Sequence, residues 1–435
     1  MDLLIRRGRV LTMAGEVLEG GSLAVAGQRI AAVGPDPEIA AAYRADCEVD
    51  ATGRAVLPGL VNTHSHAPMT LFRGLADDRE LMDWLQNYVF PAEARMVNRE
   101  FVRLGTQLAC LEMIRGGITT FADMYYFEDI VAEESARAGM RGVLGQALID
   151  FPAPDNKTWD EAVGAVRRFA EAYRGHPLIT PAVAPHAPYT VSQAHLGECR
   201  ALADELGLPL IIHLAETRAE VETIYREHRE SPTAYLSRIG FLGPRTLTAH
   251  TVWADDPDLE LLKRHGTGIA HCPQSNMKLA SGVAPVVRML KAGLAVGLGT
   301  DGAASNNDLD LWQEMQSASF LQKVSLLDPT ALPARQVLEM ATALGARALS
   351  MGDETGTLEV GKRADVIVVD LDGPHQTPLY DLASALAYTT RAGDVRTAVV
   401  DGRVIMRDRE VLTLDEASIR AQALETAERI RREVL

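Results

Sequence analysis

The middle of the chain alternates short apolar segments with helical patterns, and this alternation constrains the fold more than any other feature. Helical patterns occur at residues 99–115, 129–138, 160–173, 192–206 and 256–263. Eight strands are predicted around and between them, at residues 59–66, 118–124, 142–149, 178–186, 210–216, 246–250, 268–273 and 294–301. Eight strand–helix units predict an α/β fold, a parallel (β/α)8 TIM-like barrel with its active site at the C-terminal ends of the strands. A doubly wound open sheet is the alternative.

Both ends of the chain have a different pattern, with short β-like runs separated by glycine. Several such runs lie within residues 1–57, and two more follow the barrel region at residues 364–370 and 395–404. Strand-like runs broken by turn residues are typical of small β domains. We therefore predict a small β-sandwich domain built from residues 1–57 and 356–435 around a catalytic barrel at residues 58–355. Within the last part, residues 414–435 predict a polar amphipathic helix.

Composition narrows the class of protein. The chain has 435 residues and a formal net charge of −16, with no block of lysine or arginine. This balance argues against nucleic acid or an anionic membrane as partner. The four cysteines are scattered, as in reduced cytosolic proteins, and we find no signal peptide or transmembrane pattern. We expect a cytoplasmic protein that acts on a small molecule, and leave open whether it is a homo-oligomer.

One predicted strand ends in a His-x-His motif. The apolar run from Ala55 to Val61 predicts a buried strand, and His64 and His66 stand at its C-terminal end. Residues two apart on a strand point to the same side, so the two imidazoles project together. Such a pair can hold one divalent metal. The motif alone is weak evidence, because two histidines at a strand end can also bind nothing.

Polar residues also stand at the ends of four other predicted strands. They are His186 on the fourth strand, His213 and Glu216 on the fifth, His250 on the sixth and Asp301 on the eighth. The C-terminal ends of barrel strands meet at one face, so we expect these side chains to converge. One such residue would be unremarkable, but five such ends in one chain predict an active site and favour the barrel over the open sheet.

With these motifs in view, the chain resembles the amidohydrolase superfamily, and within it the 5'-methylthioadenosine/S-adenosylhomocysteine deaminases. The resemblance covers nearly the whole chain and is carried by Trp84 and by residues 58–70, 71–78, 91–93, 185–189, 213–216, 274–279 and 300–307. It implies metal-dependent hydrolytic deamination of adenosine-type nucleosides to the inosine derivative and ammonia. The substrates would be 5'-methylthioadenosine, S-adenosylhomocysteine or adenosine.

Other functions remain open on the same scaffold. The alternatives are a deaminase for guanine, another purine or a pterin, and a triazine-type chlorohydrolase, since these relatives share much of the pattern. A non-catalytic relative would typically lose metal ligands, whereas this chain keeps every ligand of the motif.

The resemblance implies one divalent metal per chain, with zinc expected, held by His64, His66, His213 and Asp301. Imidazoles with a carboxylate suit such an ion and leave room for water. Binuclear relatives bridge two metals with a carboxylated lysine. Here the fourth strand ends in His186, and no lysine ends the third or fourth strand. The site is therefore predicted to be mononuclear.

The resemblance also implies the catalytic roles. Glu216 would shuttle a proton between the attacking water and the ring nitrogen. His250 would hold that water or stabilise the developing oxyanion. Asp301 would act as a second proton acceptor as well as a ligand.

For the substrate, the resemblance implies that Glu93 accepts hydrogen bonds from both ribose hydroxyls. His186 would contact the ring or ribose, and Trp84 with residues 81–90 would form an apolar lid near the 5' substituent. Some relatives carry an arginine near the end of the third strand, where this chain has Gln146. How a homocysteine carboxylate would be held is therefore open, and with it the preference among the nucleosides.

Overall fold

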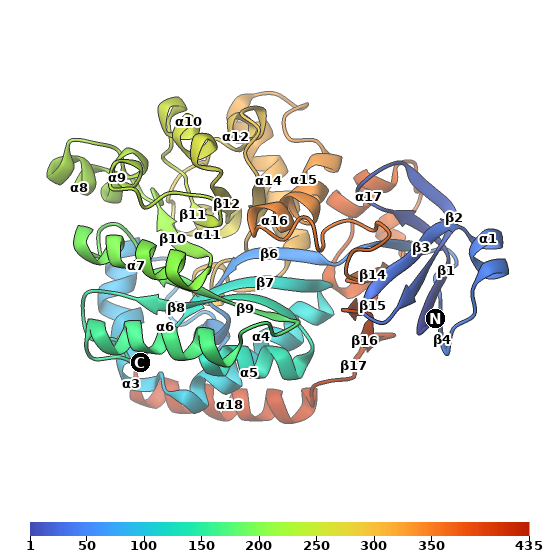
Figure 1. The fold of residues 1–435 in the computed structure, drawn as a ribbon, viewed down its shortest axis with the longest axis horizontal. Coiled ribbons are helices and arrows are strands. Elements are labelled where there is room, and N and C mark those ends of the chain that lie inside the picture. The colour runs from blue at the N-terminus through green and yellow to red at the C-terminus, as the bar shows by residue number, and fades with distance from the viewer. Residues whose placement is uncertain (435) are drawn as a thin grey trace.

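A closed barrel of eight parallel strands forms the centre of the computed structural model, which describes residues 1–434 apart from the side chains at positions 81 and 82 (Figure 1). The strands follow chain order around the barrel, and the last pairs with the first to close it. They are β6 (Leu60–Ser65), β7 (Ile118–Tyr125), β8 (Arg141–Leu148), β9 (Ile179–Pro185), β10 (Leu210–Leu214), β11 (Thr246–His250), β12 (Gly268–His271) and β13 (Val296–Leu298). The predicted barrel is confirmed.

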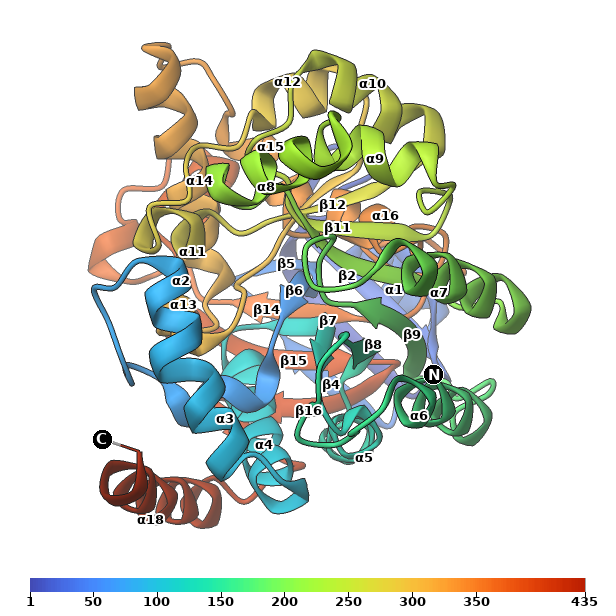
Figure 2. The same ribbon diagram turned by 90° about the vertical axis from the view of Figure 1, so that its left-hand side faces the viewer.

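Helices surround the barrel strands, as Figure 2 shows. Side-chain caps define where several of them begin; Thr158 and Glu161, for example, form a reciprocal capping box at the start of α6. The helices of this region are α4 (Arg99–Arg115), α5 (Glu128–Ala138), α6 (Trp159–Ala172), α7 (Gln193–Leu206), α8 (Arg218–His228), α9 (Pro232–Arg238), α10 (Asp256–His265), α11 (Pro273–Lys278), α12 (Val286–Lys291), α13 (Ala303–Asn306), α14 (Leu311–Leu326), α15 (Ala334–Met340) and α16 (Ala343–Ala348).

The inside of the barrel is filled by small and branched apolar side chains. Ala122, Ala184 and Ala270 pack there with larger residues such as Ile211. Ala346, Ala348 and Leu349, at the end of α16, join the same cluster and close the barrel at the starts of the strands. The interior is therefore a packed core, and the space for a ligand lies above it, at the ends of the strands.

The two ends of the chain form one mixed sheet of nine strands. β14 pairs antiparallel with β5 and so joins the C-terminal part to the N-terminal part. The strands are β1 (Leu3–Leu11), β2 (Val17–Ala26), β3 (Arg29–Pro35), β4 (Cys47–Asp50), β5 (Ala55–Pro58), β14 (Val366–Val369), β15 (Val395–Val400), β16 (Arg403–Arg407) and β17 (Glu410–Val411). Helices α1 (Asp36–Ala42) and α17 (Leu382–Tyr388) accompany them. The β unit built from both chain ends is confirmed, and its residue limits remain a proposal.

The apolar run from Ala55 to Val61 contains two strands, so the prediction of a single buried strand is wrong. β5 belongs to the small sheet and β6 to the barrel, with Gly59 between them. A Cβ on Gly59 would lie 2.1 Å from the hydroxyl oxygen of Thr119. Only glycine fits where the chain passes from one sheet to the other at this close approach.

The last helix, α18 (Glu416–Glu433), packs against the outside of the barrel helices. Arg115 pairs with Glu416 at 2.5 Å, and Arg95 donates to the carbonyl of Glu433 at 2.7 Å. The predicted terminal helix is confirmed within the described chain, while Leu435 lies outside it.

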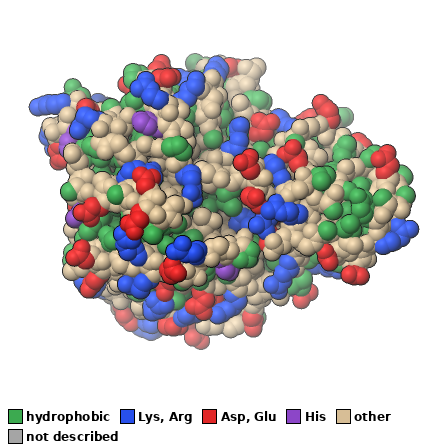
Figure 3. Space-filling model, in the orientation of Figure 1, with side chains coloured by type: hydrophobic (Ala, Val, Ile, Leu, Met, Phe, Trp, Pro, Cys, Tyr) green, Lys and Arg blue, Asp and Glu red, His purple; other side chains and the backbone are tan. Residues whose placement is uncertain are grey.

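The surface carries acidic and basic side chains interspersed, without a block of one sign on the face that Figure 3 shows. Within residues 1–434, none of the helices combines the length and the apolar character needed to cross a bilayer. The four cysteines are free thiols.

Candidate active site

The strand ends open into one pocket with an empty volume of about 750 Å³, its open mouth included. Of the predicted site residues, the lining includes His66, Trp84, Glu93, His186, His213, Glu216, His250 and Asp301. His64 packs against this set, with its ring centre 4.9 Å from that of His66 and 5.0 Å from that of His213. The structure therefore brings all the predicted site residues together.

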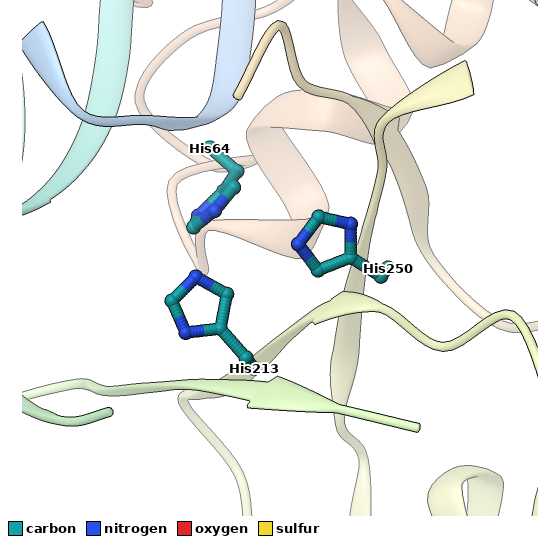
Figure 4. Close-up of side chains that lie close together, drawn as sticks. All are labelled: His64, His213 and His250. Atoms are coloured by element: carbon teal, nitrogen blue, oxygen red, sulfur yellow. The ribbon is translucent and has the colours of Figure 1, made fainter. Parts of the chain in front are cut away.

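Imidazoles and one carboxylate converge at the floor of the pocket. Nε2 of His64 and Nε2 of His66 lie 3.5 and 3.3 Å from the same Asp301 oxygen, Oδ1. His64 also faces His213 and His250, and Figure 4 shows these three rings pointing toward one another. These residues form two groups, one of His64, His66 and Asp301 and one of His64, His213 and His250, and within each group the possible ligand atoms lie within 4.8 Å of one another. Because the groups share His64, a single cation beside His64 could be bound by residues of both.

The protonation chemistry of these groups fits a metal ion. His64 is buried, and neither of its ring nitrogens hydrogen-bonds to the described residues. Burial lowers the pKa of His64 to about 4, so the ring is neutral, as a ligand must be. Burial also opposes protonation of His66, but Asp301 raises the pKa of His66 to about 9. The carboxylate therefore favours a positive charge here, which a bound cation would supply.

Neighbouring groups orient the possible ligands. Nδ1 of His66 donates to the carbonyl of Met124 at 2.6 Å, and Nδ1 of His213 donates to the carbonyl of His186 at 2.7 Å. Each bond leaves Nε2 free to face the centre of the cluster. Hydrogen bonds of this kind set the tautomer and direction of metal-binding histidines.

Two serines that the sequence analysis did not single out hold Asp301. The hydroxyls of Ser275 and Ser305 donate to Oδ2 at 2.6 and 2.9 Å, which leaves Oδ1 toward the imidazoles. Burial alone would raise the pKa of Asp301, but His64 and His66 hold it well below its usual range. Both serines lie in motif stretches that directly follow strand ends, and this position in the sequence could have identified them as site residues.

The backbone is unusual at two of the site residues. His250 has a φ of 68° and Asp301 a φ of 59°. Non-glycine residues seldom adopt this left-handed conformation, and such positions are concentrated at functional sites. Neither conformation is visible in the sequence.

Glu216 faces the pocket because the chain leaves β10 before this residue. The strand was expected to reach Glu216, but it stops at Leu214 and the chain turns at Ala215. Oε2 of Glu216 lies 3.9 Å from Nε2 of His250, whose Nδ1 donates to the side-chain oxygen of Asn276 at 3.0 Å. Burial raises the pKa of Glu216 above its ordinary value.

Glu93 lies on a helical segment whose side chains line the pocket. This segment comprises α2 (Leu81–Trp84), a π-helical turn (Leu85–Val89) and α3 (Phe90–Met96). Oε1 of Glu93 accepts a hydrogen bond from the Tyr125 hydroxyl at 2.6 Å, and burial raises the pKa of Glu93 to about 7. The sequence analysis did not identify Tyr125 as a site residue, because the strand was predicted to end one residue earlier. The polar group of Tyr125 at the end of β7 could have identified it.

The apolar lid expected at residues 81–90 has pocket-facing side chains where they are described. Trp84, Leu85, Val89 and Phe90 line the pocket. Met82 and its neighbour at position 81 lie outside the described side chains.

Two further polar residues from the sequence analysis are His186, which lines the pocket, and Gln146, which does not. His186 hydrogen-bonds through Nδ1 to the hydroxyl of Thr190 at 2.9 Å, and burial lowers its pKa to about 4. Gln146 is not among the lining residues, and its Nε2 donates to Asp155 at 2.8 Å. The described lining contains no lysine or arginine.

Comparison with known proteins places this geometry in a family. The model of the amidohydrolase family matches residues 55–405. A 5-methylthioadenosine/S-adenosylhomocysteine deaminase of Syntrophobacter fumaroxidans is 50% identical over 416 residues, which cover 95% of each chain. A 5'-deoxyadenosine deaminase of Methanosarcina mazei is 44% identical, over 99% of this chain and 98% of that one. The crystal structure of an adenosine deaminase from Xanthomonas campestris with bound zinc is 39% identical, with a TM-score of 0.97 over 99% of each chain.

Proposed function

The chain belongs to the amidohydrolase family, and on that basis we propose that it deaminates adenosine-type nucleosides hydrolytically to the inosine derivative and ammonia. Its substrates would be 5'-methylthioadenosine, S-adenosylhomocysteine, 5'-deoxyadenosine or adenosine, as the names of its relatives suggest. The observation that carries the proposal is one buried pocket that combines the imidazole–carboxylate cluster with Glu216 and Glu93.

We propose one zinc-class ion per chain, held by His64, His66, His213 and Asp301. When bound, such an ion lowers the pKa of a coordinated water to about 7 and so makes hydroxide available at neutral pH. Two observations support this ligand set: the ring nitrogens of His64 have no hydrogen-bond partner among the described residues, and His64 and His66 hold the pKa of Asp301 well below its usual range. The Xanthomonas relative, whose structure holds zinc, supports the choice of metal.

Glu216 would move the protons of the reaction. Its carboxyl is buried, and burial raises its pKa above the ordinary value, which makes the carboxylate a stronger proton acceptor. It would take a proton from the attacking water and deliver it to the ring nitrogen, so that C6 becomes electrophilic. The oxygen then bonds to C6, the C6–N bond breaks, and ammonia leaves with a proton passed on by the carboxylates.

His250 and Asp301 would hold the attacking oxygen. Because Nδ1 of His250 donates to Asn276, its Nε2 can accept a hydrogen bond from water in the pocket. Asp301, kept ionised by its histidine neighbours, would be the second proton acceptor. The serines on Oδ2 direct Oδ1 toward this task.

The substrate would lie between this cluster and the helical segment above it. Glu93 would accept hydrogen bonds from the ribose hydroxyls, with Oε2 as the principal acceptor since Oε1 already bonds to Tyr125. His186 would contact the ring or ribose. Trp84 and its apolar neighbours would cover the 5' substituent.

A free-base deaminase or a triazine-type hydrolase is the competing function. Glu93 favours a ribose, because neither competing substrate offers a diol to pair a buried carboxylate. The test is ammonia release from metal-loaded protein with a panel of 5'-methylthioadenosine, S-adenosylhomocysteine, 5'-deoxyadenosine, adenosine, adenine, guanine and a chlorotriazine. We expect turnover of nucleosides; turnover confined to free bases or to the triazine would replace the proposal.

A further inference from the structure

The turn after β10 brings two reactive groups to one side of the chain. His213 and Glu216 are three residues apart, and in an extended strand this odd spacing would point them to opposite faces. Both nevertheless line the same pocket. Ala215 lies between them with a φ of 50°, in the left-handed conformation that non-glycine residues rarely adopt. This turn therefore directs Glu216 into the pocket.

The peptide groups of the turn are held from two sides. The amides of Val252 and Trp253 both donate to the carbonyl of Ala215 at 3.0 Å. On the other side, the Glu220 carboxylate accepts from the amide of Ala215 at 2.9 Å and from the amide of Glu216 at 2.8 Å. Glu220 is only 5% exposed and does not line the pocket. Its contacts are with the backbone of the turn.

The position of Glu220 in α8 shows that this contact differs from ordinary helix capping. Thr217 is the N-cap, and its hydroxyl accepts from the amide of Glu220 at 3.2 Å. A glutamate at this third helical position commonly returns a bond to the amide of the N-cap residue. Here the carboxylate reaches past the cap to the two residues before it. Its hydrogen bonds therefore stabilise the turn instead of completing the cap.

We propose that Glu220 is a positioning residue for Glu216, fixing the turn at Ala215 and thereby the direction in which Glu216 enters the pocket. The inference rests on the proposed role of Glu216 in proton transfer. A proton shuttle must lie within hydrogen-bond reach of its partner, and a displacement of about 1 Å can cost about 100-fold in rate. Loss of Glu220 should consequently lower turnover and leave substrate affinity nearly unchanged.

The test compares Glu220→Gln with Glu222→Gln in metal-loaded, full-length protein. The amide is isosteric, but its NH2 group faces one of the two backbone amides, so one bond is lost. We expect kcat to fall about 10- to 100-fold, with KM within about 3-fold and metal content unchanged. Glu222 is on the same helix, exposed and paired with Arg218, and its variant should match wild type.

A second arm needs no substrate. Amide hydrogen exchange of the peptide that spans residues 214–217 should be faster in Glu220→Gln than in wild type and unchanged in Glu222→Gln.

A third arm measures turnover in a double variant. In the Glu216→Gln background, adding Glu220→Gln should lower the residual rate of deamination no further, since the group that Glu220 positions is gone. Wild-type turnover tests the proposed function, whereas exchange and the ratio of variant to wild-type rates test this inference.

Several outcomes would overturn the inference. They are an unchanged kcat, unchanged exchange at the turn, or a fall in metal content that matches the fall in kcat. The last would show that Glu220 supports the ligand strand as a whole. If Glu220→Gln does not fold, Glu220→Asp serves instead: it keeps the charge but is shorter, and it should likewise lower kcat at constant KM.

Discussion

At the scale of single residues, the two carboxylates nearest the imidazole cluster have opposite protonation tendencies. Burial raises the pKa of Glu216, whereas His64 and His66 hold the pKa of Asp301 well below its usual range, against the effect of burial. Pairs of titratable groups whose environments separate their pKa values mark the acid and base of a reaction. Here Glu216 is suited to carry the first proton, and Asp301 to stay ionised beside a cation until it accepts the second.

Glu216→Gln should keep metal and substrate binding and lose turnover. The amide can still hydrogen-bond, but it cannot accept and return a proton, and general acid–base help is typically worth about 10²- to 10⁴-fold. The measurements are kcat, binding of the unreacted nucleoside and metal content. A variant with kcat near wild type would show that another group shuttles the proton.

Substitution of Glu93 tests whether the substrate carries a ribose. A site that pairs a buried carboxylate with a diol can reject analogues that lack the hydroxyls by about 10⁴-fold or more. Wild type should therefore deaminate 5'-methylthioadenosine far better than its 2',3'-dideoxy analogue or free adenine. Glu93→Ala should lose most of its kcat/KM on the nucleoside and narrow this gap, because remote binding energy that positions the ring is gone.

The comparison of the same three compounds in both proteins decides the role of Glu93. Tyr125→Phe is the matched variant, since it removes only the hydrogen bond to Oε1 and keeps the carboxylate. It should lower kcat/KM less than Glu93→Ala does. If Glu93→Ala depresses all three compounds equally, Glu93 is structural and a free-base substrate becomes the better hypothesis.

At the scale of elements, the proposed metal ligands come from three separate strands or their ends. His64 is on β6 and His66 directly follows it, His213 is on β10, and Asp301 follows β13. A bound ion would link these strands where the barrel is open to solvent. Because it would bind the folded chain and not the unfolded one, it should stabilise the fold by mass action.

Purified protein should hold one zinc-class ion per chain, and its removal by a chelator should abolish turnover and lower the thermal midpoint. Elemental analysis and thermal unfolding measure the two effects. His66→Asn should bind the ion weakly, whereas His195→Asn, which changes a histidine outside the pocket, should keep it. Two tightly bound ions, or none after reloading, would contradict the mononuclear site.

At the scale of the whole molecule, a buried ion-pair network joins the barrel to the small sheet. Arg141 begins β8 and donates through Nε and Nη2 to Asp365, at 2.9 and 3.1 Å, and through Nη2 to Asp401 at 3.0 Å. Asp365 directly precedes β14, and Asp401 directly follows β15. The Arg141 side chain is 3% exposed and that of Asp365 is fully buried. Arg141 therefore depends on these partners for compensation of its charge.

Asp365→Asn should destabilise the protein by about 3–5 kcal/mol, because it leaves a buried guanidinium with a single carboxylate partner. Denaturant unfolding followed by fluorescence gives the change. Asp129→Asn, which breaks the half-exposed pair with Arg99, should have little effect. Turnover of folded Asp365→Asn should match wild type, since Asp365 does not line the pocket; equal stability of both variants would show that the network is dispensable.

The sequence by itself determined the barrel, the β unit from both chain ends and the set of polar strand ends. These features are local: apolar runs, capping residues and glycine breaks depend on neighbours along the chain. His64 and His66 could be paired because residues two apart on a strand point to one side, and the other polar strand ends could be grouped because parallel strands end at one face. The choice of His213 and Asp301 as their fellow ligands came from the resemblance to the family.

Only the tertiary structure decided how those residues are held. The break at Gly59 depends on the approach of Thr119, and the hydrogen bond of Tyr125 to Glu93 joins residues from two different elements. The turn at Ala215, which sends Glu216 into the pocket, is held by Glu220 on one side and by residues after β11 on the other. Such conformations depend on contacts between segments that are distant in the chain, and no local periodicity encodes them.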